Sequence, residues 1–178
     1  DGRRLTQEEL IQNCIFLLNA GHETTTSLVG NGTHILLTHR DQHKRLLDEP
    51  DLIAPAVEEF LRFQSPLQIG NRLLTKDMTF SGKTLKAGTY VHTSIGAANR
   101  DPEIFDNPDQ VDIGRNPNRH LAFITGIHVC LGATLARIEG RIAIGRLVKR
   151  FPDLQLSGEV TIMGLARFRG FNRIDMRI

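Results

Sequence analysis

The sequence lacks several features that would assign a function class at once. Its two cysteines, Cys14 and Cys130, are too few and too far apart for a disulfide framework or a zinc site. No run approaches the roughly 20 apolar residues of a membrane span, and no signal-peptide pattern opens the chain. The formal net charge of +2 is too small to indicate nucleic-acid binding. These absences favour a protein of the reducing cytoplasm that does not bind nucleic acid.

What remains is the composition of an ordinary globular chain. It has 178 residues, of which 40% are hydrophobic and 24% are charged. These values are typical of one folded domain. The first residue is Asp1 rather than Met, so we expect a processed or cut N-terminus.

The first segment predicts one long helix. Thr6 and Glu9 have the spacing of a capping box, and no proline follows until well beyond Thr38. Residues 14–18 are apolar at consecutive positions, hence around the whole circumference of the helix. Such a helix needs packing partners on every side. We therefore expect protein that this chain does not contain.

The rest of the sequence predicts shorter elements and, overall, a mainly α fold with small β-sheets. The first is a helical region at 46–63, interrupted by Pro50 and Pro55. β-like segments follow at 67–95, with a hairpin at 79–84 and a strand at 89–93. After them we expect an irregular coil at 100–120, a helix at 131–151 and short β-like runs to the end.

The segment around Cys130 has the strongest chemical signal. Cys130 stands just before a predicted helix, where free N–H groups and the helix dipole favour a thiolate. Gly126 and Gly132 leave the backbone bare on both sides, so that a flat ligand can approach the sulfur. Phe123 offers an aromatic cover for it. The alternative is a buried, inert cysteine that caps a helix, as most lone cysteines do.

Residues 123–132 resemble the cysteine-ligand loop of cytochromes P-450, in which Phe, Gly, a basic residue, Cys and Gly recur in this order. The matching positions are Phe123, Gly126, His128, Cys130 and Gly132. The resemblance implies that Cys130 ligates the iron of haem b (iron protoporphyrin IX). Ile124 departs from the family, which has a small or polar residue there. We expect its branched side chain to crowd the loop or the haem face and to bear on haem affinity.

Residues 20–25 resemble the oxygen-activation motif of the same family's central helix. Gly21 costs about 1 kcal/mol relative to Ala inside a helix, which makes sense if dioxygen must lie against the backbone. Glu23 and Thr24 form an acid–alcohol pair suited to proton delivery, and the resemblance makes them the catalytic pair. The alternative is a distorted, threonine-rich helix turn with an exposed glutamate.

Two further resemblances concern arginines. Glu59 and Arg62 can pair on one helix face and resemble the family's Glu-x-x-Arg helix, with Arg115 as the third, structural member. Arg72, together with His120 and His128, would donate to the two haem propionates. For Arg72 the alternative is a solvated strand end.

Other features receive a simpler interpretation. Residues 98–102 match the family's entry into the coil and are given a structural role, and Cys14 is assigned to the core.

The last helix carries five cations against Glu139: Arg137, Arg141, Arg146, Lys149 and Arg150. On the family pattern this face would steer an acidic electron donor, a ferredoxin or flavodoxin. A merely solvated cationic face explains the pattern equally well.

The resemblance implies that residues 1–178 are the C-terminal, haem-binding part of a cytochrome P-450 fold, from the long central helix through the cysteine loop to the last helix, with the N-terminal part absent. The implied function is a haem-thiolate monooxygenase that activates O2 and inserts one oxygen into a hydrophobic substrate. The alternative is a truncated, inactive fragment without haem that serves as a structural or interaction remnant. In either case we expect an exposed apolar face at 14–18, through which the isolated chain self-associates.

Overall fold

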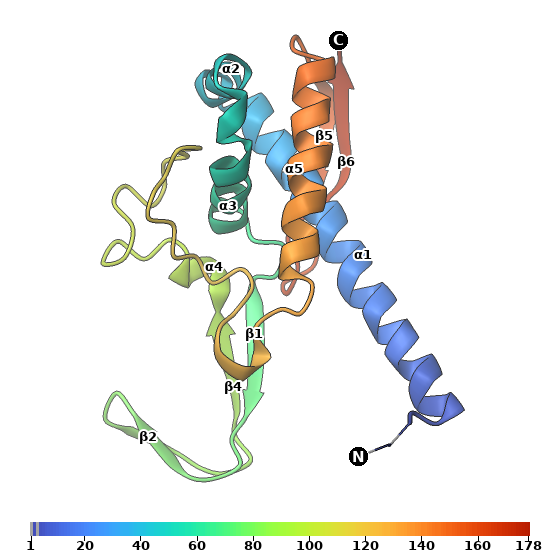
Figure 1. Ribbon diagram of the computed structural model, residues 1–178. Helices are drawn as coiled ribbons and strands as arrows, with labels where there is room; N and C mark the ends of the chain where they lie inside the picture. Colours follow the sequence, from blue (N-terminus) through green and yellow to red (C-terminus); the bar gives the residue numbers. More distant parts are fainter. Residues whose placement is uncertain (1, 3) are drawn as a thin grey trace.

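The structure is a computed structural model that describes residues 2 and 4–178, and it confirms a mainly α fold with small sheets (Figure 1). The helices are α1 (Gln7–Thr38), α2 (Arg40–Asp48), the 3-10 turn η1 (Pro50–Leu52), α3 (Ile53–Phe63), the short α4 (Ile95–Ala98), the 3-10 turn η2 (Gly126–His128) and α5 (Ala133–Arg150). The strands are β1 (Ile69–Leu73), β2 (Met78–Phe80), β3 (Lys83–Leu85), β4 (Tyr90–Ser94), β5 (Gln155–Ile162) and β6 (Phe171–Arg177). No helix in the described part of the chain is both long and apolar enough to cross a membrane.

The long helix α1 begins and ends where the sequence predicts. The Glu9 amide donates to Thr6 Oγ1 at 3.2 Å, and the Thr6 amide donates to Glu9 Oε2 at 2.8 Å, which completes the capping box. The helix then runs without interruption to Thr38. Both the cap and the length are confirmed.

The next helical region differs from its prediction. It begins at Arg40 rather than near residue 46, and Pro50 opens a 3-10 turn between α2 and α3. Pro55 does not interrupt a helix, because it lies in the first turn of α3. The N–H groups of a first turn have no partner within their helix, so a proline costs little there.

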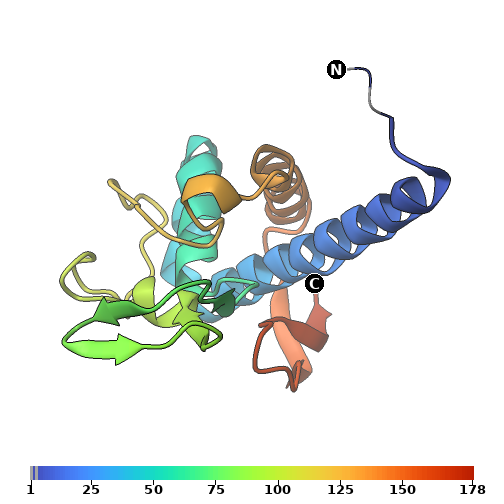
Figure 2. The same ribbon diagram turned by 90° about the horizontal axis from the view of Figure 1, so that it is seen from below.

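The core lies between the second half of α1, α3 and α5, which Figure 2 shows side by side. Leu28, Phe60 and Ile144 are fully buried at this junction. Gly32 of α1 permits the close approach: a Cβ atom there would lie 2.6 Å from Ile144 Cδ1 and 2.8 Å from Phe60 Cδ2. The core therefore depends on a bare backbone at this point of α1.

In the described part of the chain, three two-stranded antiparallel sheets lie around the helices. β2 and β3 form the predicted hairpin, with Ser81 and Gly82 at positive φ in a two-residue turn. β4, paired with β1, contains most of the strand predicted at 89–93. β5 and β6 pair near α1, where the rings of His34 and Phe171 lie 4.5 Å apart. The sheets thus extend from the helical core rather than form one.

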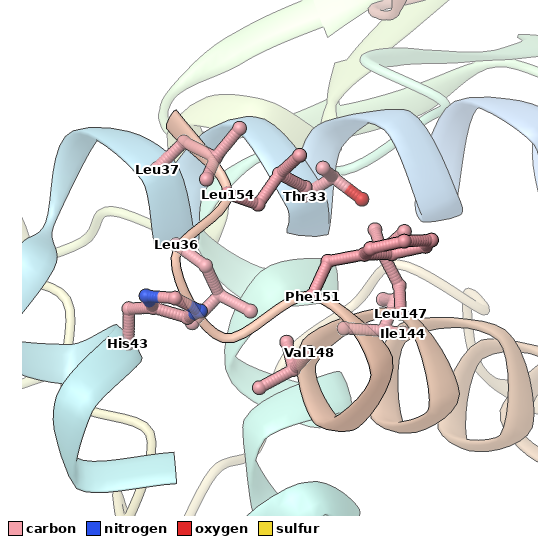
Figure 3. Close-up of a pocket in the computed structure, with 9 residues that line it drawn as sticks. All are labelled: Thr33, Leu36, Leu37, His43, Ile144, Leu147, Val148, Phe151 and Leu154. Carbon is pink, nitrogen blue, oxygen red and sulfur yellow. The ribbon is translucent and has the colours of Figure 1, made fainter. Parts of the chain in front are cut away.

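A small cavity of about 10 Å³ lies inside the packed helices (Figure 3). It is lined by Thr33, Leu36, Leu37, His43, Ile144, Leu147, Val148, Phe151 and Leu154. It has room for about one water molecule, so it cannot admit an organic ligand. Burial lowers the pKa of His43 at its edge, and the nearby Arg40 charge acts in the same direction. The cavity is a packing gap rather than a substrate site.

Candidate functional site

The loop that carries Cys130 closes on itself just before α5. The Cys130 amide donates to the Phe123 carbonyl at 3.0 Å, and Gly126 takes a φ of 76° to turn the chain between them. α5 begins at Ala133, two residues later than predicted. Cys130 is exposed, which argues against the alternative of a buried capping cysteine. The loop therefore presents a sulfur on a firmly closed turn.

The backbone of Ile124 is strained at this turn, whereas a glycine would not be. Its φ is 57°, in the left-handed region that β-branched residues avoid. Such a conformation costs about 1–3 kcal/mol and persists only where the surroundings enforce it. The isoleucine that departs from the family pattern therefore strains the backbone of the loop.

Apolar side chains around Cys130 face away from the core. Ile127 is 97% exposed, Leu131 is 93% exposed, and Val129 is also exposed. Large apolar residues rarely gather on a free surface without a partner. This surface suits a flat, apolar ligand set against the sulfur.

The first half of α1 projects away from the other elements of the described chain (Figures 1 and 2). Phe16 is 68% exposed and Leu18 is 70% exposed, so the predicted exposed apolar face is confirmed. The assignment of Cys14 to the core is wrong, because this half of α1 has no packed neighbour among the described residues and leaves Cys14 exposed.

Gly21, Glu23 and Thr24 lie on α1 where it leaves the core. A Cβ atom on Gly21 would meet nothing within 4 Å, so the space beside the backbone is open. Thr24 Oγ1 donates to the Ala20 carbonyl at 2.7 Å, which leaves its lone pairs free to accept. Glu23 is half-buried rather than fully exposed. Their catalytic role stays a prediction.

The structural triad is present and fully buried at its centre. Arg62 donates from Nε and Nη2 to the two Glu59 oxygens, at 2.8 Å each. Arg115 Nε lies 3.2 Å from Glu59 Oε2. Asn118 and the Asp112 amide donate to the same carboxylate. A buried charge of this kind is tolerable only when every oxygen is paired, and here both are.

Glu58, which the sequence did not single out, joins α3 to α5 and to the coil just before the cysteine loop. Arg137 donates to it bidentately, from Nε at 2.8 Å and Nη2 at 3.0 Å, and His120 Nε2 lies 3.0 Å from Oε2. Burial alone would raise the pKa of Glu58, but the hydrogen bonds and charges of His120 and Arg137 outweigh it and lower the pKa to about 2. The only sequence signal was a second acid beside Glu59.

These contacts concern two residues that the sequence analysis singled out. The His120 side chain is 3% exposed, its Nε2 faces Glu58, and its Nδ1 accepts from the Ala122 amide. Its role toward a haem propionate stays a prediction. Arg137 is not a merely solvated cation, because Glu58 holds it. The exposed basic residues of α5 are therefore Arg146, Lys149 and Arg150.

The other predicted anion-binding residues remain available. Arg72 lies half-buried on β1 and donates to the Asn71 carbonyl at 2.7 Å, and His128 is exposed in the cysteine loop. Neither takes part in an ion pair between described residues. Together with the exposed thiol and the surrounding apolar side chains, they fit a ligand with an apolar plane, an iron and carboxylates. The donor set is thus compatible with haem.

Comparison with known proteins shows the family of the chain. The family model "Cytochrome P450" matches residues 52–163. The chain is 52% identical to a vitamin D(3) 25-hydroxylase of Pseudonocardia autotrophica, over 99% of the chain and 45% of the relative. It is 50% identical to a biotin biosynthesis cytochrome P450 of Bacillus subtilis, over 86% of the chain and 39% of the relative.

Solved structures show the same likeness. One is P450BioI in complex with an acyl carrier protein ligated to hexadec-9Z-enoic acid, with a TM-score of 0.95 at 47% identity over 98% of this chain and 46% of that one. Another is CYP109E1 from Bacillus megaterium in complex with testosterone, with a TM-score of 0.96 at 40% identity over 99% of this chain and 50% of that one. The chain spans half or less of the length of these proteins, and it belongs to the cytochrome P450 family.

Proposed function

We propose that residues 1–178 are the C-terminal, haem-binding part of a cytoplasmic haem-thiolate monooxygenase that inserts one oxygen atom into a hydrophobic organic substrate. The observation that carries this proposal is the exposed Cys130 thiol, held on a closed loop and surrounded by exposed apolar side chains. Haem b, when bound there, supplies oxygen activation, and a thiolate ligand favours O–O cleavage.

The chain's own residues divide the remaining work. Cys130 ligates the iron, while Phe123, Gly126 and Gly132 shape the loop that presents it. Arg72, His120 and His128 bind the haem carboxylates. Glu59, with Arg62 and Arg115, anchors the coil that leads into the loop.

Proton delivery falls to the open turn of α1. Gly21 leaves space beside the backbone, and the Thr24 hydroxyl, oriented by the Ala20 carbonyl, can accept a hydrogen bond in that space. Glu23, one residue earlier, holds or releases the proton. Both side chains are half-buried, which keeps them near solvent without exposing them fully.

The relatives favour a large apolar substrate. One is named for vitamin D(3), another similar protein is a steroid C26-monooxygenase of Mycolicibacterium smegmatis, and a solved neighbour holds testosterone. Electrons would come from a ferredoxin or flavodoxin that docks on the exposed Arg146, Lys149 and Arg150 of α5. The exposed face of α1 would pack against the upstream part of the longer protein, and in the isolated chain against a second copy.

The two cysteines provide a matched test. Full-length protein loaded with haem, reduced and exposed to carbon monoxide should give the red-shifted absorption band of a thiolate-ligated haem. Cys130→Ala should abolish the band completely, whereas Cys14→Ala, at the other exposed cysteine, should retain it. A band that survives Cys130→Ala, or is lost in Cys14→Ala, would contradict the assignment.

The alternative is an inactive remnant without haem. It is favoured if the 178-residue chain binds no haem while the full-length protein does, in which case the activity belongs to the longer protein only. If the full-length protein also lacks the band, the remnant is the better description.

A further inference from the structure

The ion pair of Glu58 and Arg137 lies next to the loop that bears Cys130, because Arg137 contacts Phe123 of that loop. Arg137 lies on the first turns of α5 and is held bidentately by Glu58 of α3, at 2.8 and 3.0 Å. A bidentate pair fixes the plane of a guanidinium as well as its position. The Arg137 charge is therefore fixed in place rather than spread over a mobile side chain.

That fixed guanidinium lies over the aromatic ring of the cysteine loop. Arg137 Cζ is 4.5 Å from the centroid of Phe123, a cation–π distance. The backbone carbonyl of the same Phe123 accepts a hydrogen bond from the Cys130 amide, at 3.0 Å. His120 completes the arrangement, with its ring 6.0 Å from that of Phe123 and its Nε2 on Glu58.

We propose that Arg137, which Glu58 and Phe123 hold beside the cysteine loop, raises the reduction potential of the Cys130-ligated iron by its positive charge, and that Glu58 limits this effect by neutralising that charge. The inference rests on the proposed haem-thiolate function. Reduction of the iron adds one electron, so a nearby cation stabilises the reduced state and a nearby anion stabilises the oxidised state. Removing one partner leaves the charge of the other less compensated, although Arg141 Nη2, at 3.9 Å from Oε1, and His120 still face Glu58.

The two single substitutions therefore have opposite expected effects. Glu58→Gln keeps a side-chain oxygen for the Arg137 N–H groups but removes the negative charge, so the midpoint potential should rise. Arg137→Gln removes the closer of the two arginines that face Glu58, so the potential should fall. The double variant removes both charges and should return close to the unsubstituted value.

The experiment is a spectroelectrochemical titration of full-length, haem-loaded protein without an electron-donor protein. The carbon monoxide band is recorded first for each variant, to establish that the thiolate still ligates the iron. Arg146→Gln is the control: Arg146 is an exposed cation on the same helix, without an ion pair among the described residues, and its loss should shift the potential less than that of Arg137.

The outcomes separate the two hypotheses. Opposite shifts in the single variants, with recovery in the double, support the inference. Shifts in one direction, no shift, or loss of thiolate ligation in both single variants would overturn it and leave the pair as a structural link. Absence of the band in the unsubstituted protein would instead overturn the proposed function on which the inference depends.

Discussion

The two halves of α1 have opposite surroundings although they belong to one uninterrupted helix. In the second half, Leu28, Ile35 and Leu36 are each 1% exposed against α3 and α5. In the first half, Phe16 and Leu18 are more than two-thirds exposed. The capping box and the helical hydrogen bonds explain why both halves are helical, but only the second half has a packing partner within the described chain.

The contrast separates what this chain stabilises by itself from what it leaves open. The Glu59 carboxylate is fully paired with groups of α3 and the coil, and the core helices bury their apolar side chains against one another. The side that bears Cys130, Gly21 and the first half of α1 presents apolar surface and a strained backbone instead. This is the side on which the proposed haem and substrate would lie.

The largest effect on stability is expected in the part that the chain stabilises by itself, at the triad of Glu59, Arg62 and Arg115. Arg62→Ala would leave the buried Glu59 with only one arginine and should cost about 3–5 kcal/mol in the free energy of unfolding. Lys44→Ala is the control: it removes an exposed ion pair with Asp48 and should cost less than about 1 kcal/mol. Urea unfolding of the two variants measures both costs. Similar costs for the two would contradict the claim that the buried ion pairs of Glu59 stabilise the fold more than an exposed pair does.

Acid should weaken the link between the two regions. The pKa of Glu58 is lowered from 4.5 to about 2, so its contribution is fully present above pH 4.5 and is lost as the pH falls toward 2. A shift of this size corresponds to a contribution on the order of 3 kcal/mol. The difference in unfolding free energy between the unsubstituted protein and Glu58→Gln should therefore shrink across this range. A difference that is independent of pH would show that the partners of Glu58 do not lower its pKa.

Two glycines of α1 test the halves directly. Gly32→Ala places a Cβ against the buried Phe60 and Ile144 and should cost about 1–3 kcal/mol in the free energy of unfolding. Gly21→Ala meets no atom within 4 Å and should instead stabilise the helix by about 0.5–1 kcal/mol in protein without haem. Thermal and urea unfolding would measure both, and effects of the same sign would contradict the comparison.

The smallest expected effect concerns the strain in the cysteine loop. Ile124→Gly removes a β-branched residue from a φ of 57° and should raise the free energy of unfolding by about 0.5–1 kcal/mol, after the entropic cost of a glycine. Ile127→Gly, at an almost fully exposed neighbour, is the matched control and should not stabilise. A loss of stability in Ile124→Gly would mean that its side-chain contacts outweigh the strain.

Local sequence patterns predicted much of the fold. The capping box at Thr6 and the proline-free stretch after it fixed the extent of α1, because both act within a few residues. The Ser81–Gly82 hairpin was predictable for the same reason. Pro55 was misjudged because a proline in a first helical turn cannot be told from an interrupting one without knowing where the helix begins.

The sequence by itself determined the cysteine loop, the Glu59–Arg62 spacing and the apolar face of α1, since each is a short-range pattern. The tertiary structure alone decided the partners of Glu58. Successive residues point about 100° apart on a helix, so Glu59 turns toward the coil and its neighbour Glu58 toward α5. Glu58 therefore meets His120 and Arg137, respectively 62 and 79 positions away. No local pattern encodes a contact over such distances, because it depends on how α3 and α5 pack.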